Sequence, residues 1–216
     1  MISKRIQAVA AFIPPAKTIA DIGCDHGYLI IEAFINHNIS YAIAIDNEEK
    51  PLAQAKRNIL PYSFYNNVRF SLSNGLSDLN EAVDVIILSG IGGINALDII
   101  KNNIENIKGA RLIIQAARNL YNLRLGLNNL GFSISREEII KDSNHFYEII
   151  EFIPNSKEKY NKIELTFGPC FLKQKPKLFL EKLNKELKRL KSIAINTKEI
   201  TEKIMMIEEI LCKLKI

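Results

Sequence analysis

Residues Thr18–Asn36 read TIADIGCDHGYLIIEAFIN, and they contain a short apolar run, a glycine-bearing turn and a longer apolar segment. The run at 18–22 predicts a strand, and the spacing of apolar residues from about Gly27 onward predicts a helix. Gly23 and Gly27 stand between them, where the backbone must bend sharply. A strand, a tight turn and a helix in this order form the first half of a βαβ unit.

The same alternation continues along the chain. Further strands are expected at 41–45, 68–72, 83–88 and 110–115, and further helices at 48–60, 93–103 and 120–130. Strands that are apolar throughout are buried on both faces, which is typical of a parallel sheet covered by helices. The alternation therefore predicts right-handed βαβ units in a doubly wound α/β domain.

The alternation changes after Gly131. Two strand candidates, 132–140 and 146–153, are joined by only a few residues, so they must form an antiparallel hairpin. A nicotinamide-binding Rossmann domain would normally continue with parallel strands. Five parallel strands followed by a C-terminal antiparallel hairpin instead predict an α/β fold with a Rossmann-like methyltransferase sheet.

Both ends of the sequence are expected to be helical. Residues 6–13 have helical apolar spacing, with Ser3 as N-cap and Pro14 as a stop, which favours an amphipathic helix over a signal peptide. No segment has the ~20 apolar residues of a membrane span. From Lys177 onward, leucines and isoleucines three and four apart predict an antiparallel, coiled-coil-like pair of helices, with Asn196 capping the second.

Charge divides the chain into two parts. Lys/Arg and Asp/Glu give a balance of −2 up to Ile153 and +7 from Pro154 onward, within the net charge of +5. We therefore expect a catalytic domain at 1–155, which is the cofactor-binding part, and a basic helical domain at 156–216 that binds a polyanion. The alternative is a lysine-rich solvated surface without a binding role. The three cysteines are widely spaced and odd in number, which argues against disulfides and a metal site and favours a reducing cytosol.

The first turn has the composition of a site for a cationic ligand. Asp21, Gly23, Cys24 and Asp25 occupy it, and the G-x-G-x-x-G pattern of dinucleotide-binding turns is missing. Two carboxylates would repel a phosphate, whereas they suit the sulfonium and α-amino groups of S-adenosylmethionine (SAM). The alternative interpretation is a structural loop in which Asp25 caps the following helix.

Three later loops complete a nucleoside site. Asp46 ends the second strand and is expected to bind ribose hydroxyls, with Asn47 beside it. Asn74 and Gly75 follow the third strand, where polar groups would hold an adenine edge. After the fourth strand, we expect a flat acceptor to lie against the glycine-rich residues Ser89, Gly90, Ile91, Gly92 and Gly93. Ligands of open parallel sheets bind beyond the carboxyl ends of the strands, where all these loops fall.

Six segments together resemble the bacterial tRNA adenine-22 N1-methyltransferases. They are ADIGCDHGYL (20–29), AIAIDNEEKPLAQAKRNI (42–59), SNGL (73–76), DVIILSGIGG (84–93), FYEIIEF (146–152) and FGPCFLKQKP (167–176). The D-H pair and the G-x-G-G turn are the distinctive features. This chain departs from the family at Cys24 and Gly27 (commonly Ser and Ala), at Ile91 (commonly Met) and at Ala116-Ala117, where the family tends to Pro-Asn.

The resemblance implies a SAM-dependent enzyme that methylates N1 of an adenine at position 22 in tRNA. The N1 lone pair is already nucleophilic, so no strong general base is needed, but the base must be unpaired or flipped out. His26 and Tyr28 are candidates for the acceptor pocket, although a carbonyl-capping His26 and a core Tyr28 are the alternatives. Phosphate contacts are expected from Arg118, Lys173, Lys175 and Lys177. A cytoplasmic monomer is the expected form.

Three other functions compete with this one. The chain could methylate another RNA or a small molecule, because only the resemblance selects tRNA adenine. It could be an RNA-binding protein without activity, although acidic residues facing a polyanion argue against that. A nicotinamide oxidoreductase is disfavoured by the missing glycine fingerprint and by the terminal hairpin.

Overall fold

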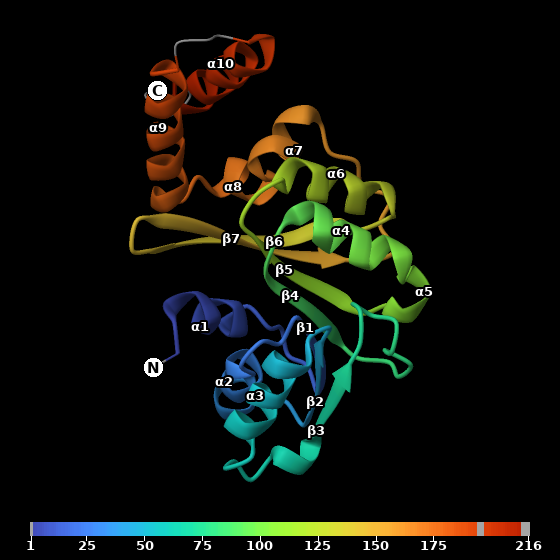
Figure 1. Cartoon of the computed structure of the whole chain (residues 1–216). Coiled ribbons are helices and arrows are strands. Elements are labelled where there is room, and N and C mark those ends of the chain that lie inside the picture. Colours follow the sequence, from blue (N-terminus) through green and yellow to red (C-terminus); the bar gives the residue numbers. More distant parts are fainter. Residues whose placement is uncertain (1, 194–196, 213–216) are drawn as a thin grey trace.

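The computed structural model describes residues 2–193 and 197–212, and a seven-stranded sheet lies at its centre (Figure 1). The strands are β1 (Thr18–Ile22), β2 (Tyr41–Asp46), β3 (Val68–Leu72), β4 (Val85–Ile91), β5 (Arg111–Ala116), β6 (Ser133–Asp142) and β7 (His145–Ile153). Their order is β3-β2-β1-β4-β5-β7-β6. Strands β1 to β5 are parallel, and β7 runs antiparallel to both of its neighbours. The predicted sheet is confirmed.

Helices cover both faces of this sheet. Those packed on one face are α1 (Lys4–Ala11), α2 (Tyr28–Asn36) and α3 (Glu49–Ile59), and those on the other are α4 (Gly93–Asn102), α5 (Ile104–Ile107) and α6 (Leu120–Asn129). Along β4, Val85 and Ile87 face the first layer, whereas Ile86 and Leu88 face the second. Because both faces are buried, the strands need apolar residues at every position, as the sequence indicated. A single turn of 3-10 helix (Tyr65–Asn67) precedes β3.

The N-terminal helix α1 packs against the sheet. The Ser3 hydroxyl accepts a hydrogen bond from the Ile6 N–H at 3.3 Å, so the predicted N-cap is confirmed. On β6, Arg136 donates to the carbonyl oxygen of Phe12 at 2.5 Å, and its guanidinium lies 3.9 Å from the centre of the Phe12 ring. These contacts fix α1 against the sheet. None of the helices in the described part of the chain is long and apolar enough to cross a bilayer.

Strand β4 is longer at its carboxyl end than expected. It continues through Ser89 and Gly90 to Ile91, residues that the hydrophobic pattern places in the following loop. Its pairing with β5 shifts between Ser89 and Ile91, and Gly90 has a φ of 85°, so the last residues form a bulge. Hydrophobicity marks only the buried part of a strand, and the ladder itself continues where side chains become polar.

Two short helices follow β7, in the part of the expected helical domain where no individual helix was predicted. They are α7 (Lys162–Phe167) and α8 (Pro169–Gln174), separated by Gly168. Asn161 and Glu164 form a capping box at the start of α7. Each helix has 6 residues, which is less than two turns, so neither displays a readable period in the sequence.

The last helices, α9 (Lys177–Lys191) and α10 (Lys198–Cys212), form the expected pair, but they cross. Ion pairs join Glu186 to Lys203 and Lys191 to Glu208, so the C-terminal half of α9 contacts the middle of α10. Figure 1 shows α10 lying across the C-terminal half of α9. The two helices therefore cross instead of lying side by side along a continuous coiled-coil-like seam. Asn196, the expected cap, lies outside the described residues.

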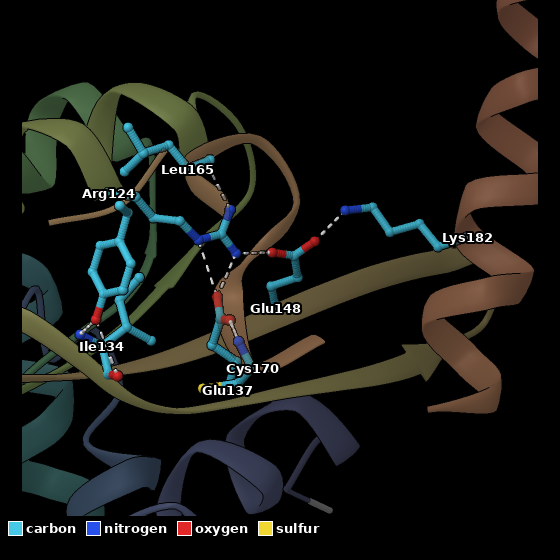
Figure 2. A network of polar contacts seen from close by, with 8 residues as sticks. Arg124, Ile134, Glu137, Glu148, Leu165, Cys170 and Lys182 are labelled. Atoms are coloured by element: carbon cyan, nitrogen blue, oxygen red, sulfur yellow. Dashed lines mark hydrogen bonds and ion pairs between the residues drawn. The ribbon is translucent and has the colours of Figure 1, made fainter. Parts of the chain in front are cut away.

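A buried ion-pair network ties this C-terminal region to the sheet (Figure 2). The fully buried Arg124 of α6 donates to Glu137 Oε1 at 2.7 and 3.0 Å and to Glu148 Oε2 at 2.6 Å. Glu148 also pairs with Lys182 on α9, and Arg124 donates to the carbonyl oxygen of Leu165 on α7 at 3.4 Å. Burial alone would raise the pKa of Glu148, but Lys182 and Arg124 outweigh it and lower that pKa.

The same network explains a motif in the sequence. Glu137 Oε2 accepts a hydrogen bond from the backbone N–H of Cys170 at 2.9 Å. A Cβ at Gly168 would lie 2.5 Å from both Glu137 carboxylate oxygens, and Gly168 has a φ of 92°. Only glycine therefore fits there. The segment FGPC has a structural role, because it brings α8 onto a buried carboxylate.

We predict that Arg124→Met destabilises the protein by about 3–5 kcal/mol, because it leaves two carboxylates buried without their cation. At this chain length the melting temperature should fall by roughly 10 °C, measured by circular dichroism. The control is the triple variant Arg124→Met/Glu137→Gln/Glu148→Gln, which should recover part of the loss. A single variant as stable as the wild type would contradict the assignment of a charge-balanced network.

Candidate functional site

Two adjoining cavities lie at the carboxyl ends of the parallel strands, and Gly23 lines both. The larger has a volume of about 260 Å³ and is lined by residues of the β2, β3 and β4 ends. These include Asp46, Asn47, Ser73, Asn74, Gly75 and Ile91. The smaller has a volume of about 60 Å³ and contains the acidic β1 loop. It is lined by Asp21, Gly23, Cys24, Asp25, His26, Tyr28 and Ser89, with Arg5, Ile6 and Leu29.

Asp46 organises the β1 loop. One of its carboxylate oxygens accepts the Asp25 N–H at 3.1 Å, and the other accepts the Glu48 N–H at 3.0 Å. The N–H groups of Gly23 and Cys24 donate to the Ile45 carbonyl at 2.8 and 3.0 Å. The loop is therefore fixed to the end of β2. Burial raises the pKa of the Cys24 thiol, so this residue contributes packing rather than a nucleophile.

Asp21 is a buried carboxyl group among other carboxyl groups. It is 3% exposed, and its pKa is raised to about 7 by burial, by Asp46 and by Asp25. Carboxylates held close together repel one another, and a cationic ligand beside them would relieve that repulsion. The site therefore suits a positively charged ligand, as the sequence predicted for this loop.

The competing structural interpretations of this loop do not match the geometry. Helix α2 begins after Gly27, so Asp25 does not cap it; Asp25 adopts a positive φ of 48°. The His26 ring lies 3.5 Å from an Asp25 oxygen, and its centre lies 5.9 Å from that of Tyr28. Tyr28 is 41% exposed and so does not belong to the core. Both rings are at the surface of the smaller cavity.

The glycines after Ser89 serve different purposes. The Gly93 N–H donates to the Arg118 carbonyl at 3.0 Å, and a Cβ there would lie 2.7 Å from the Asn119 carbonyl oxygen. Gly93 therefore permits close packing between the start of α4 and the loop after β5, and its N–H is not available to a ligand. Gly92 precedes α4 and has open space around it.

Two residues of the site were missed from the sequence. Arg5 of α1 donates from Nη1 to Gln115 Oε1 at 2.9 Å and to Ser89 Oγ at 3.4 Å. Gln115 is 1% exposed and faces Ser89 across the β4–β5 ladder. Gln115 could have been noticed, because a polar residue at the end of an apolar strand indicates a site. Nothing in the local sequence pattern indicates that Arg5 of α1 reaches this edge.

The β6–β7 hairpin carries the C-terminal helices to the same edge of the sheet. Strand β5 ends at Ala116, opposite Glu148, and the first three residues of β7 pair with β6 alone. Beyond that point, Lys141 pairs with Glu181 at 2.5 Å, and Lys185 donates to the Asn144 carbonyl at 3.0 Å. Figure 1 shows α9 standing at the tip of this hairpin.

The four residues expected to contact phosphates lie on this C-terminal part and on the loop after β5. Lys173, Lys175 and Lys177 span the end of α8 and the start of α9, and Arg118 follows β5. Within residues 2–193 and 197–212, no ion pair engages their side chains. Several other lysines of the region pair with glutamates, which supports the solvated-surface interpretation for those lysines only.

The arrangement fits SAM. The acidic cavity matches its cationic end, the Asp46 carboxylate lies where ribose hydroxyls need an acceptor, and Asn47, Asn74 and Gly75 line the cavity in which its base would lie. Within the described residues, no group of three or more His, Cys, Asp or Glu side chains could hold a metal ion.

Comparisons with known proteins agree with this chemistry. The profile of the TrmK family, tRNA (adenine(22)-N(1))-methyltransferase, matches residues 19–215. The tRNA (adenine(22)-N(1))-methyltransferase of Bacillus subtilis (strain 168) is 30% identical over 199 residues, covering 89% of this chain and 84% of its own.

Solved structures are similar over nearly the whole chain. Streptococcus pneumoniae Sp1610 in complex with S-adenosyl-L-methionine has a TM-score of 0.91 and 31% identity, over 98% of this chain and 100% of that one. M. capricolum TrmK in complex with S-adenosyl-homocysteine has a TM-score of 0.86 and 30% identity, over 97% of each chain.

We predict that Asp21→Asn stabilises the ligand-free protein at pH 8 and has little effect near pH 4. Since the pKa is raised to about 7 from 3.8, the native state retains a proton that the unfolded state has lost between these values. The stability that Asp21 contributes is therefore present below pH 4 and lost as the pH rises through 7. The gain at pH 8 should be on the order of a few kcal/mol, measured by urea unfolding.

The control is Asp25→Asn in the same loop, whose side chain is 71% exposed and which should give a smaller gain at pH 8 than Asp21→Asn, because Asp25 is the weakest of the three causes that raise the pKa of Asp21. An equal effect of Asp21→Asn at both pH values would show that the substitution acts through packing, against the prediction.

Proposed function

This chain belongs to the tRNA (adenine(22)-N(1))-methyltransferase family, and from that premise we propose which of its residues bind each part of the reaction. The family and the activity predicted from the sequence motifs are confirmed: the chain is a SAM-dependent methyltransferase that acts on N1 of adenine 22 in tRNA. We assign roles to individual residues because an acidic cavity and a polar cavity adjoin at one edge of the sheet.

In the proposed cofactor site, Asp46 accepts hydrogen bonds from the ribose hydroxyls, and Asn47, Asn74 and Gly75 surround the adenine. Asp21, Gly23, Cys24 and Asp25 face the methionine end, where the two carboxylates balance positive charge. When bound, SAM supplies a methyl group made electrophilic by its sulfonium.

In the proposed acceptor pocket, the target adenine enters between the end of β4 and the exposed rings of the β1 loop. Ser89, Gly90 and Ile91 present the bulged end of β4, and His26 and Tyr28 stack on or hydrogen-bond to the base. The chain aligns the N1 lone pair with the methyl carbon and excludes water, which is the main requirement of an in-line displacement. No residue has to remove a proton from N1.

The proposed tRNA surface lies on residues 156–216 together with Arg118. This part carries the excess positive charge, and the β6–β7 hairpin brings it to the edge that holds the acceptor pocket. Lys173, Lys175 and Lys177 are available for phosphates because no glutamate neutralises them among the described residues. The boundary near residue 155 thus separates a catalytic from a substrate-binding part, although the two share buried contacts.

We also propose that the enzyme works as a monomer in the cytosol. Residues of one chain line both the cofactor cavity and the acceptor cavity. The three cysteines are free thiols, which suits a reducing compartment.

We predict that purified protein transfers label from SAM into 1-methyladenosine of an unmodified tRNA transcript, detected by nucleoside analysis. A transcript with guanine in place of adenine 22 is the matched control and should remain unlabelled. Label in a different nucleoside would overturn the acceptor assignment, and label in both transcripts would overturn the position.

We predict that the triple variant Lys173→Gln/Lys175→Gln/Lys177→Gln binds tRNA more weakly and with a smaller salt dependence. Each lost phosphate contact should lower the slope of log K against log salt by roughly 0.7–0.9. The matched control replaces three lysines that already pair with glutamates, Lys162→Gln/Lys191→Gln/Lys203→Gln, and so removes the same net charge. Equal salt slopes for the two variants would contradict a specific phosphate-binding surface.

A further inference from the structure

The smaller cavity contains charges of both signs. Asp21 and Asp25 supply its carboxylates, and Arg5 supplies a permanent cation. Arg5 comes from α1, a helix that precedes the β1 loop and was expected only to pack against the domain. An arginine beside two carboxylates in a cavity of about 60 Å³ indicates a ligand that carries a positive and a negative group close together.

The position of Arg5 is fixed from three sides. Its Nη1 donates to Gln115 Oε1 and to Ser89 Oγ, and the buried Gln115 cannot turn away into solvent. A Cβ at Gly90 would lie 2.8 Å from Nη1, and so the glycine makes room for the guanidinium. A solvated surface arginine would need neither a buried partner nor a glycine beneath it.

Most of the donors of Arg5 remain available. A guanidinium has five N–H donors in a planar fork, and the hydrogen bonds of Arg5 use Nη1 alone. No carboxylate among the described residues pairs with it. The Nε and Nη2 groups are therefore available for a bidentate interaction with a planar anion.

We infer that Arg5 binds the α-carboxylate of the cofactor, in the same cavity where Asp21 and Asp25 face its α-amino group. An amino-acid head group carries an ammonium and a carboxylate on one carbon, which matches the two signs of charge in this small space. Gln115 is then a positioning residue, because it orients Arg5 without touching the ligand. This inference rests on the proposed function for the identity of the cofactor.

A tRNA phosphate fits the same position less well. It would have to enter a narrow cavity lined by Asp21 and Asp25, which repel an anion that carries no ammonium of its own. The exposed lysines of α8 and α9 offer phosphate a position without such repulsion. The experiment described next distinguishes binding of a tRNA phosphate by Arg5 from binding of the cofactor carboxylate.

The test compares S-adenosylhomocysteine with its decarboxylated analogue, which keeps the thioether and the amine and lacks only the carboxylate. Dissociation constants are measured by isothermal titration calorimetry for the wild type, Arg5→Gln and Arg5→Lys. We expect the wild type to prefer S-adenosylhomocysteine by roughly 10- to 100-fold, the range of a hydrogen bond to a charged group. Arg5→Gln should lose that preference by weakening the binding of S-adenosylhomocysteine alone, and Arg5→Lys should retain part of it.

Lys4→Gln is the matched control, because it removes one positive charge from the same helix at an exposed position outside the cavity. It should bind both ligands as the wild type does. Melting temperatures of all variants report whether the substitutions disturb the fold. The wild-type comparison alone already tests the inference if Arg5→Gln does not fold.

Three results would overturn the inference. The wild type could bind both ligands equally, Arg5→Gln could weaken both by the same factor, or Arg5→Gln could leave both unchanged while the KM for tRNA rises, as a phosphate-binding role requires. Failure of the proposed function would look different, since the wild type would then bind neither ligand and would not form 1-methyladenosine.

Discussion

The candidate site depends on one constraint, which is that β1 to β5 are parallel and end at the same edge of the sheet. Asp21, Asp46, Ser89 and Gln115 stand near the carboxyl ends of four different strands, and this edge brings them together. Elsewhere the same strands are buried on both faces and must be apolar. Polar groups are tolerated at the edge because loop N–H groups, neighbouring side chains and a ligand can satisfy them there.

Because β7 runs antiparallel to β5, the turn of the β6–β7 hairpin also lies at this edge. The β6–β7 hairpin extends past the end of β5, and α9 packs at its tip. The contact is held by Arg124, Glu137, Glu148 and Lys182, charges that are stable in the interior only as a complete set. The basic helices are thus attached to the active-site side of the sheet by a network that cannot be loosened at one member alone.

The sheet, the position of the loops at its carboxyl edge and the family were predictable because each is encoded locally: the hydrophobic period, the glycine positions and the order of strands can be identified along the chain. Other features depend on distant pairs. Arg5 meets Gln115, and Arg124 meets Glu137 and Glu148, only after folding, and a single sequence gives no sign of these contacts. The end of β4 was missed because hydrogen bonding, not hydrophobicity, continues it, and α7 and α8 are too short to display a period.

An enzyme that methylates tRNA must hold a cationic cofactor beside a polyanion, and burial is how this chain reconciles the two. Asp21 and Asp46 are 3% and 7% exposed, so their charges act over short distances on a ligand inside the cavities. Lys173 and Lys177 of α8 and α9 are at the surface, where attraction to phosphates extends over a Debye length of about 8–10 Å. The net negative charge of residues 1–153 and the net positive charge of residues 154–216 agree with this requirement.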